Sequence, residues 1–205
     1  LAGFMESINY AVSLYPNHLE LFRLSVLPGT DLHDRAHDLG LVYDVKPPYL
    51  VHSTPSFSEQ DLFKAEKTAQ ACNVFYSQGR AVSWFIAVVK PLKMNYADFF
   101  KKLAQYLENK PLLSCPSLTD IEKMQKDFVK TIYTEKKLLS LLPWVEDIIS
   151  LYSALSRYDS DGTDSTLSLR YSAQSLLDMA ALDGINFCRI HRAGKYSVTV
   201  SKLIL

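Results

Sequence analysis

The sequence contains only three cysteines, Cys72, Cys115 and Cys188. They are odd in number and far apart, which excludes a disulfide framework and a CxxC metal-binding knuckle. Sparse thiols of this kind are typical of reduced, mostly buried cysteines, so we expect a cytoplasmic protein.

The sequence also lacks an excess of charge and a long apolar run. Lys and Arg together number 22, as do Asp and Glu, which gives no electrostatic reason to expect a nucleic-acid partner. The longest apolar stretch, 81–89, is too short to cross a bilayer and contains Trp84, so we expect no transmembrane segment. The chain opens at Leu1 without Met and without a signal peptide, and we expect it to be a piece of a longer polypeptide.

Several motifs of enzyme sites are absent. The sequence has no Walker lysine loop, no GxGxxG and no GxSxG. Residues 159–164 superficially resemble a calcium loop, but with Gly162 at the sixth position Arg157 would be first and Ser168 twelfth, where an EF-hand needs Glu. A solvated turn is the better interpretation of this segment.

The composition is that of an ordinary globular protein. Of the 205 residues, 48% are hydrophobic and 21% charged, which argues against disorder and against a coiled coil. A chain of this length forms one large or two small domains and needs no metal or disulfide to fold.

The first 45 residues alternate helix and strand signals. Apolar residues from Phe4 to Tyr15 recur at helical spacing up to Pro16, and a nearly continuous apolar run, 19–27, is typical of a strand buried on both faces. A turn follows, and then a predicted helix over 31–39, closed by Gly40. One strand cannot form a sheet, so its partners must lie downstream or upstream of Leu1.

The middle of the chain is predicted to be helical. Prolines make 46–56 an extended linker, and Ser58, with Asp61 three residues later, marks a helix start. Further helices are predicted up to Tyr158, with Pro143 in a first turn. The expected helices span 58–79, 80–89, 96–107, 117–142 and 143–158.

The tail shows β-like runs at 167–171, 185–190 and 196–203, with a short helix near 176–182. Together these elements predict a mixed α and β fold that is predominantly helical. It consists of a short α/β unit, resembling part of a barrel, followed by a helical domain and a small β-containing tail. The predicted boundaries are 1–45 for the first unit, 46–56 for the linker, 57–158 for the helical domain and 159–205 for the tail.

Two side-chain patterns have both a chemical and a structural interpretation. His33 and His37, four residues apart on a predicted helix, are spaced to share a metal, but no third ligand is evident and a wet helix flank is the better interpretation. Aromatic residues recur at helical intervals in the middle region, which is usually bundle core and only occasionally the wall of a ligand pocket. These are Trp84, Phe85, Phe99, Phe100 and Tyr106.

An ordered series of motifs carries a family resemblance. Pro28-Gly29-Thr30 ends the apolar run, Gly40 closes the next helix, Pro47-Pro48-Tyr49 follows, and Phe57-Ser58 leads another helix. This series resembles the last barrel strand and exit segment of cobalamin-binding radical S-adenosylmethionine proteins, in the group similar to the anaerobic magnesium-protoporphyrin IX monomethyl ester oxidative cyclase. The specific part covers 1–49, and 57–84 resembles the start of the family's helical region.

The resemblance implies an upstream cobalamin-binding domain and a partial barrel that carries a [4Fe-4S] cluster and S-adenosylmethionine. It implies radical chemistry on an organic substrate, such as a tetrapyrrole. The cluster needs a CxxxCxxC motif, which this sequence does not contain, so the chain cannot hold the cluster or start the radical by itself. We expect no catalytic residue, cofactor or metal in this piece alone.

Barrel geometry directs attention to one end of the apolar run. Since active sites lie at the carboxyl ends of barrel strands, we expect Arg23, Ser25, Pro28, Gly29 and Thr30 to border the S-adenosylmethionine or substrate pocket. An ordinary turn is an equally good interpretation of the last three. Arg23 and Ser25 favour one face of the strand as the barrel interior, and Glu20 favours the other.

Two functions therefore compete. In the first, the chain is the C-terminal part of a radical enzyme, inert alone, and supplies a barrel strand and a helical lid on the substrate side. Its exposed strand edge is then expected to be poorly ordered, covered, or paired in a dimer. In the second, the chain is a self-contained helical interaction or regulatory domain, in which 19–27 pairs with the C-terminal strands.

Overall fold

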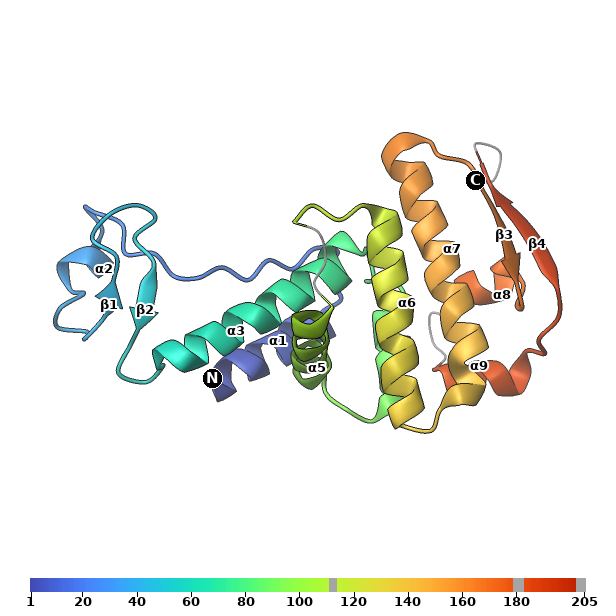
Figure 1. Ribbon diagram of the computed structural model, residues 1–205, viewed down its shortest axis with the longest axis horizontal. Helices are drawn as coiled ribbons and strands as arrows, with labels where there is room; N and C mark the ends of the chain where they lie inside the picture. Colours follow the sequence, from blue (N-terminus) through green and yellow to red (C-terminus); the bar gives the residue numbers. More distant parts are fainter. Residues whose placement is uncertain (111–113, 179–182, 202–205) are drawn as a thin grey trace.

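The computed structural model describes residues 1–110, 114–178 and 183–201 of the chain. It is elongated, with a small N-terminal lobe at one end, a helical body in the middle and a two-stranded sheet at the other end (Figure 1). The α-helices are α1 (Ala2–Ser13), α2 (Asp31–Asp34), α3 (Glu59–Cys72), α4 (Phe85–Val89), α5 (Tyr96–Asn109), α6 (Leu118–Glu135), α7 (Leu142–Asp161), α8 (Ala173–Leu177) and α9 (Gly184–Ile190). The other elements are β1 (Val42–Tyr43), β2 (Val51–Ser53), β3 (Ser165–Leu169), β4 (Tyr196–Val200), the π-helix η1 (Asn73–Gln78) and the 3-10 helices η2 (Lys90–Leu92) and η3 (Leu139–Leu141).

Helices α3 and α6 of the body begin where the sequence provides side-chain caps. The Ser58 hydroxyl accepts a hydrogen bond from the backbone N–H of Asp61 at the start of α3, and Ser117 and Asp120 form a capping box at the start of α6. Gly162 ends α7 in the left-handed conformation. The predicted helices at 58–79, 96–107 and 143–158 are thereby confirmed.

The core of the body is largely aromatic. Phe75 of η1 lies edge-on to Trp84, Phe85 and Phe99, with ring centroids 5.1–5.9 Å apart. Four of the five aromatic residues singled out in the sequence are fully buried here, and Tyr106 packs at the edge of the same cluster. The aromatic pattern therefore marks bundle core, as its structural interpretation predicts.

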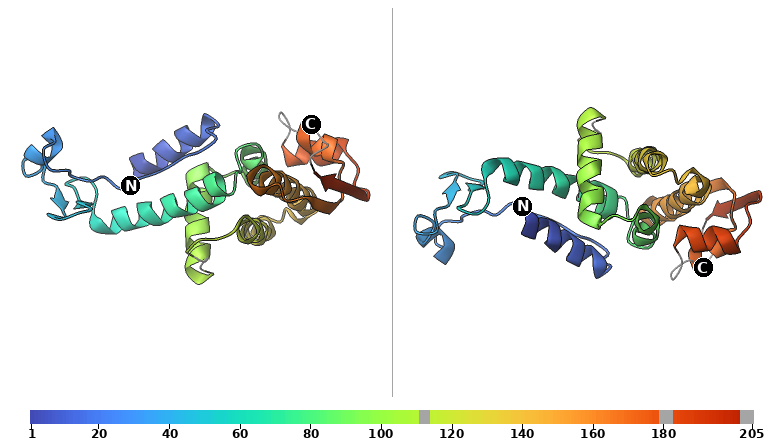
Figure 2. Two further views of the ribbon diagram at one scale, coloured as in Figure 1. Left: turned by 90° about the horizontal axis from the view of Figure 1, so that it is seen from above. Right: turned by 90° about the horizontal axis from the view of Figure 1, so that it is seen from below.

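Helix α1 belongs to this body rather than to the lobe. Its buried residues Ile8 and Val12 are part of the main core, and α1 contacts α5. Figure 2 shows α1 running beside α3, well separated from α2. The sequence groups α1 with the segment that follows it, but the apolar face of the helix is buried against the helical region.

The N-terminal lobe contains α2 and an antiparallel pair of very short strands, β1 and β2. Its separate core consists of Val26, Ala36 and Val51. The predicted helix 31–39 is wrong in length, because α2 ends at Asp34 and turns lead to Gly40, whose φ is +63°. The segment 46–56, expected as a linker, contains β2 and pairs back onto β1.

The segment 19–26, called the strap below, is extended but does not form a regular strand. It joins α1 to the lobe, and within the described residues it pairs with another segment at one place, an antiparallel bridge between Ser25 and Leu50. The prediction of a strand over 19–27 is therefore wrong as regular secondary structure, because a single bridge does not make a ladder. The strap does not pair with β3 or β4, which pair with each other.

The C-terminal region contains a two-stranded sheet that packs against α7. Its strands β3 and β4 pair antiparallel over five residues, and α8 and α9 lie between them in the sequence. The predicted strand at 185–190 is wrong, since α9 spans Gly184–Ile190. The Asp183 side chain caps this helix, and Phe187 is buried beside the Trp144 ring, whose atoms lie where a Cβ on Gly184 would be. Residues 179–182 and 202–205 of the predicted helix and strand lie outside the described residues.

Two further helix boundaries differ from the prediction. Only Phe85–Val89 of the expected helix 80–89 is α-helical, because Arg80 has a positive φ and turns precede α4. The expected helix 117–142 is interrupted after Glu135, where Lys137 has a positive φ. The mixed, predominantly helical fold with a small β-containing tail is nevertheless confirmed. Among the described residues, no helix is both long and apolar enough to cross a membrane.

Candidate functional site

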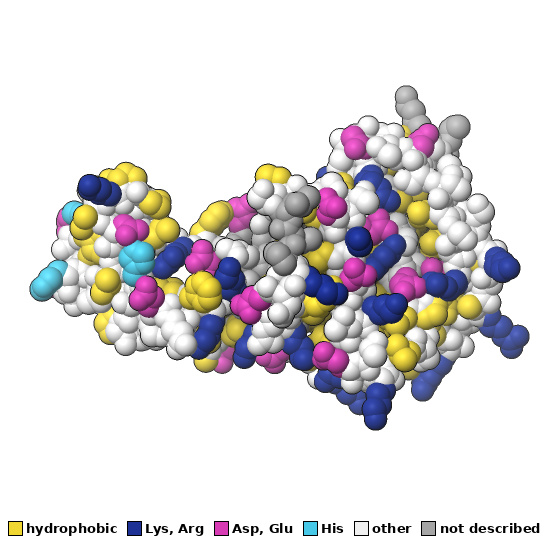
Figure 3. Space-filling view, viewed as in Figure 1, with side chains coloured by type: hydrophobic (Ala, Val, Ile, Leu, Met, Phe, Trp, Pro, Cys, Tyr) yellow, Lys and Arg dark blue, Asp and Glu magenta, His cyan; other side chains and the backbone are white. Residues whose placement is uncertain are grey.

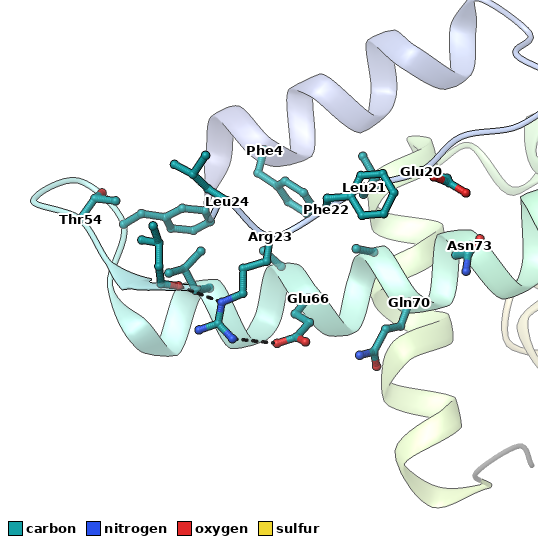
Figure 4. Close-up of a pocket in the computed structure, with 15 residues that line it drawn as sticks. Phe4, Glu20, Leu21, Phe22, Arg23, Leu24, Thr54, Glu66, Gln70 and Asn73 are labelled. Atoms are coloured by element: carbon teal, nitrogen blue, oxygen red, sulfur yellow. Dashed lines mark hydrogen bonds and ion pairs between the residues drawn. The ribbon is translucent and has the colours of Figure 1, made fainter. Parts of the chain in front are cut away.

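The strap covers an apolar groove of about 470 Å³, called the strap groove below. Its walls come from the strap, from α3, from β2 and from Phe4 of α1 (Figure 4). The volume is within the range of small-molecule sites, which are mostly apolar with a few placed polar groups. The lining residues are Phe4, Glu20, Leu21, Phe22, Arg23, Leu24, Val51, Thr54, Phe57, Leu62, Ala65, Glu66, Ala69, Gln70 and Asn73.

One end of the strap is fixed to the π-helix η1. The Ser77 hydroxyl donates to the backbone C=O of Leu19 at 2.8 Å and accepts from the Leu19 N–H at 3.0 Å. The Tyr76 hydroxyl donates to the C=O of Pro16 at 2.8 Å, and both side chains are buried. Burial, with smaller contributions from Cys72 and Tyr15, raises the pKa of Tyr76 to about 12, so this hydroxyl remains a donor.

The other end of the strap is bonded to the lobe. The N–H of Val51 donates to the C=O of Leu24 at 2.9 Å, and the N–H of Val26 donates to the C=O of Tyr49 at 2.8 Å. These two bonds flank the Ser25–Leu50 bridge. The strap is therefore held at both ends and stretched across α3 between them.

Arg23 is the central polar group of the groove. Its Nε–H donates to the C=O of Val51 at 2.8 Å, and its guanidinium lies 3.6 Å from Glu66 of α3 and 3.4 Å from Nδ1 of His52 (Figure 4). His52 in turn contacts Asp44 through Nε2 at 2.8 Å. Arg23 thereby joins the strap, β2 and α3, and its charge is balanced by Glu66 rather than left to attract an anion.

Between its two fixed ends the strap has backbone groups without partners. None of the N–H or C=O groups of residues 20–23 bonds to another residue in the described ranges. Successive residues of an extended chain direct their backbone N–H and C=O groups to opposite edges. Since Leu24 and Val26 bond to the lobe at 49–51, the backbone groups of Arg23 and Ser25 face away from β2. Phe22 is 83% exposed and Leu24 52% exposed. This combination is an open strand edge with an apolar surface.

The residues expected to border a pocket are only partly brought together. Arg23 lines the strap groove, and Ser25 lies next to it at the bridge to Leu50. Pro28, Gly29 and Thr30 lie beyond the groove in an exposed turn of the lobe. There the Thr30 hydroxyl donates to the C=O of Leu27 and accepts from the N–H of His33, so this residue caps α2.

The histidines and cysteines are not gathered into a ligand set. His33 lies 3.4 Å from Asp34, and His37 is fully exposed beside Asp38. In the part of the chain that the structure describes, no group of three or more His, Cys, Asp or Glu side chains is placed to hold a metal ion. Burial raises the pKa of the Cys72 thiol to about 12, so this cysteine is protonated and unsuited to bind metal.

Three residues of the site were not singled out in the sequence. Tyr76 and Ser77 occur in an ordinary helical pattern, and nothing in it signals that a π-helical turn directs both toward the strap. Glu66 is one of several charged residues on α3. Arg23 was identified from the resemblance to a barrel strand, and that reasoning does not extend to partners that lie on an amphipathic helix.

Comparisons with known proteins add no relative. No protein-family model, no curated protein and no solved structure matches the chain.

Proposed function

We propose that the chain is the C-terminal part of a cobalamin-binding radical S-adenosylmethionine enzyme similar to the cyclase group. In this proposal the strap is one strand of the catalytic barrel, and the helical body is a lid on the substrate side of the barrel mouth. The cluster, S-adenosylmethionine and cobalamin are held by upstream parts of the same polypeptide. The chain alone is not catalytic, and we place the enzyme in the cytoplasm, consistent with its three free cysteines.

The open edge of the strap is the observation that carries this proposal. An extended segment with unpaired backbone groups at 20–23 and exposed Phe22 and Leu24 is a template for another strand. In a barrel, both faces of a strand are covered, and such strands are apolar throughout. The covering strand is the kind of partner that this edge lacks among the described residues.

The way in which the strap is held also suits a strand that receives a neighbour. Ser77 fixes Leu19, and the lobe fixes Leu24 and Val26, so the intervening residues are already extended. Pairing then costs little further backbone entropy. The strap groove behind them, with Arg23 in its wall, is an apolar site for part of an organic substrate, and the resemblance suggests a tetrapyrrole.

The decisive test begins with the reading frame upstream of Leu1. We expect a CxxxCxxC motif there, and the longer polypeptide, reconstituted anaerobically with iron and sulfide and supplied with dithionite as the one-electron reductant of the cluster, should release 5′-deoxyadenosine from S-adenosylmethionine. The present chain treated in the same way should bind no stoichiometric cluster, because its cysteines are isolated. An upstream frame without the motif, or a four-iron cluster on the present chain, would overturn the proposal.

Substitution at the open edge tests the role given to the strap. Phe22→Asp in the longer polypeptide should abolish 5′-deoxyadenosine release, because a carboxylate cannot be buried on the covered face of a barrel strand. Phe63→Asp is the matched control, since Phe63 is 56% exposed on α3 and does not line the strap groove. In the present chain the same edge is available to a second copy, so size-exclusion chromatography should show a dimer that Phe22→Asp dissociates. Equal effects of the two substitutions would exclude the strap as a barrel strand.

A self-contained helical interaction domain is the second candidate. The observation in its favour is the body's closed core, which contains two fully buried tryptophans and needs no upstream residue. The two candidates differ in what the upstream region does to the strap. Protection of residues 20–24 from hydrogen exchange should rise strongly in the longer polypeptide if the strap is a barrel strand, and should stay unchanged if the chain is an independent domain.

A further inference from the structure

The charges of the chain are balanced overall but separated along its length. Residues 1–66 contain nine Asp or Glu and only four Lys or Arg, whereas residues 184–205 contain four Lys or Arg and no acid. A molecule with zero formal net charge therefore has one acidic end and one basic end. The net charge of the whole chain does not reveal this separation, because the acidic excess at one end and the basic excess at the other cancel.

The fold adds further cations to the basic end. Helix α9 contacts both η2 and η3, and Lys90 at the start of η2 pairs with Asp183 before α9 at 3.5 Å. The turns beside these elements carry Lys93, Lys136 and Lys137. Figure 3 shows lysine and arginine side chains gathered along the lower edge of the body, where these turns and α9 lie in Figure 1. The basic end is defined here by Lys93, Lys136, Lys137, Arg189 and Arg192.

These five cations are exposed and uncompensated. None of them forms an ion pair within the described residues, in contrast to Lys90, Lys102 and Lys126, which do. Lys93 and Lys137 both have positive φ values, at turns that bring them to the surface. Five neighbouring positive charges without carboxylate partners create a local field that attracts an anionic surface.

Exposed aliphatic side chains are interspersed with the charges. Ile190 in the last turn of α9 is 64% exposed, Leu139 of η3 is 54% exposed and Ile185 is 38% exposed. Contacts to a nucleic-acid backbone use cations and polar donors and give no role to exposed isoleucines. A membrane interface uses both, because cations bind the headgroups while aliphatic side chains enter the boundary with the acyl chains.

We propose that the basic end binds peripherally to anionic lipid bilayers. The five cations contact the headgroups, and Ile190, Leu139 and Ile185 enter the interfacial layer without any helix spanning the membrane. The acidic end, residues 1–66, then points away from the surface, since the anionic headgroups repel it. This inference concerns a surface remote from the strap groove and stands or falls independently of the proposed enzyme.

Vesicle co-sedimentation of the present chain tests the proposal. Binding should be strong on equimolar phosphatidylcholine and phosphatidylglycerol, weak on phosphatidylcholine alone, and reduced by salt. Each cation near such a surface contributes roughly a fivefold change in partitioning, so Lys136→Glu with Lys137→Glu should weaken binding by at least about 25-fold. Equal binding to both vesicle types, or an unchanged double variant, would overturn the proposal.

Matched variants separate a local effect from a change in net charge. Lys46→Glu with Lys123→Glu has the same net charge as the first double variant, and both of these lysines are exposed and lie outside the basic end. It should bind anionic vesicles nearly as well as the wild type. Arg189→Gln with Arg192→Gln, on a different element, should weaken binding even if the lysine variant folds poorly.

Two further measurements address the choice of partner. Ile190→Ser should lower the binding that remains at high salt, because that part depends on the aliphatic side chain. If instead the chain binds duplex DNA with a steep salt dependence and does not bind anionic vesicles, the basic end is a nucleic-acid surface and the bilayer proposal is wrong.

Discussion

The helical body and the N-terminal lobe are stabilised in different ways. The body buries Trp84, Trp144 and a cluster of phenylalanines at essentially zero exposure, whereas the core of the lobe has only three fully buried residues, Val26, Ala36 and Val51. Because apolar burial must offset the entropy of ordering the chain, the body is self-sufficient. The lobe depends on hydrogen bonds to the strap and on Leu62 of α3.

This difference bears on function. The region with the weakest core also exposes large apolar side chains, among them Phe22, Val45 and Leu27. A small core together with an uncovered apolar surface is expected of a segment that packs against a neighbouring part of a larger protein. The body also exposes apolar side chains, but its core is large, and we therefore propose the body as the lid and the strap as the part that receives a partner.

The largest loss of stability is expected from a substitution in the core of the body. Phe75→Ala should lower the free energy of unfolding by about 3–5 kcal/mol, because Phe75 is fully buried among four other aromatic rings. Phe22→Ala removes the same atoms from an 83% exposed site, and at a concentration where the chain is monomeric it should change the free energy of unfolding by less than about 0.5 kcal/mol. Urea unfolding of the two variants measures both values, and similar losses would contradict the contrast between body and lobe.

A smaller effect should be confined to the strap and the lobe. Ser77→Ala removes both hydrogen bonds to Leu19, each worth about 0.5–1.5 kcal/mol, and so releases one end of the strap. Hydrogen exchange should accelerate over residues 17–27 while the amides of α6 and α7 keep their protection. Ser150→Ala is the matched control, because Ser150 donates only within its own helix. Equal acceleration in α6 would show that the strap and the body unfold together.

The sequence predicted those features that depend on local chemistry. Ser58 marks a helix start through capping, which depends on residues a few positions away, and Gly40 has the positive φ expected of it although the helix before it is shorter than predicted. The aromatic core followed from helical periodicity. Arg23 was identified from the resemblance to a barrel strand and from the rule that active sites lie at the carboxyl ends of such strands.

Features that depend on distant residues could not be predicted in this way. The apolar run 19–27 reads as a strand, but whether it forms a ladder depends on partners that the described residues supply only at Leu50. Ile185–Ile190 reads as a strand and folds as α9, because the Asp183 cap and the packing of Phe187 on Trp144 outweigh β propensity. Ser77 and Glu66 reach the strap only through the placement of α3 and η1.

The smallest expected effect is a pH dependence of stability that arises from Asp147, which is buried at the end of the body that carries the sheet. Burial raises the pKa of Asp147, partly offset by hydrogen bonds from the N–H groups of Arg170 and Tyr171. The folded protein then holds this proton at a pH where the unfolded chain has released it. The contribution of Asp147 to the free energy of unfolding therefore falls as the pH rises through the window above the ordinary pKa of an aspartate.

Asp147→Asn removes this titration, so the thermal midpoint of the wild type relative to the variant should decrease as the pH rises through that window. Asp127→Asn, at an exposed position of α6, is the control for the loss of one charge and should give a difference that does not depend on pH in this way. A wild type that gains stability over Asp147→Asn as the pH rises would mean that the hydrogen bonds to the carboxylate outweigh its burial. The body would then depend on a buried charge at its sheet-bearing end, as the strap depends on the partly buried charge of Arg23.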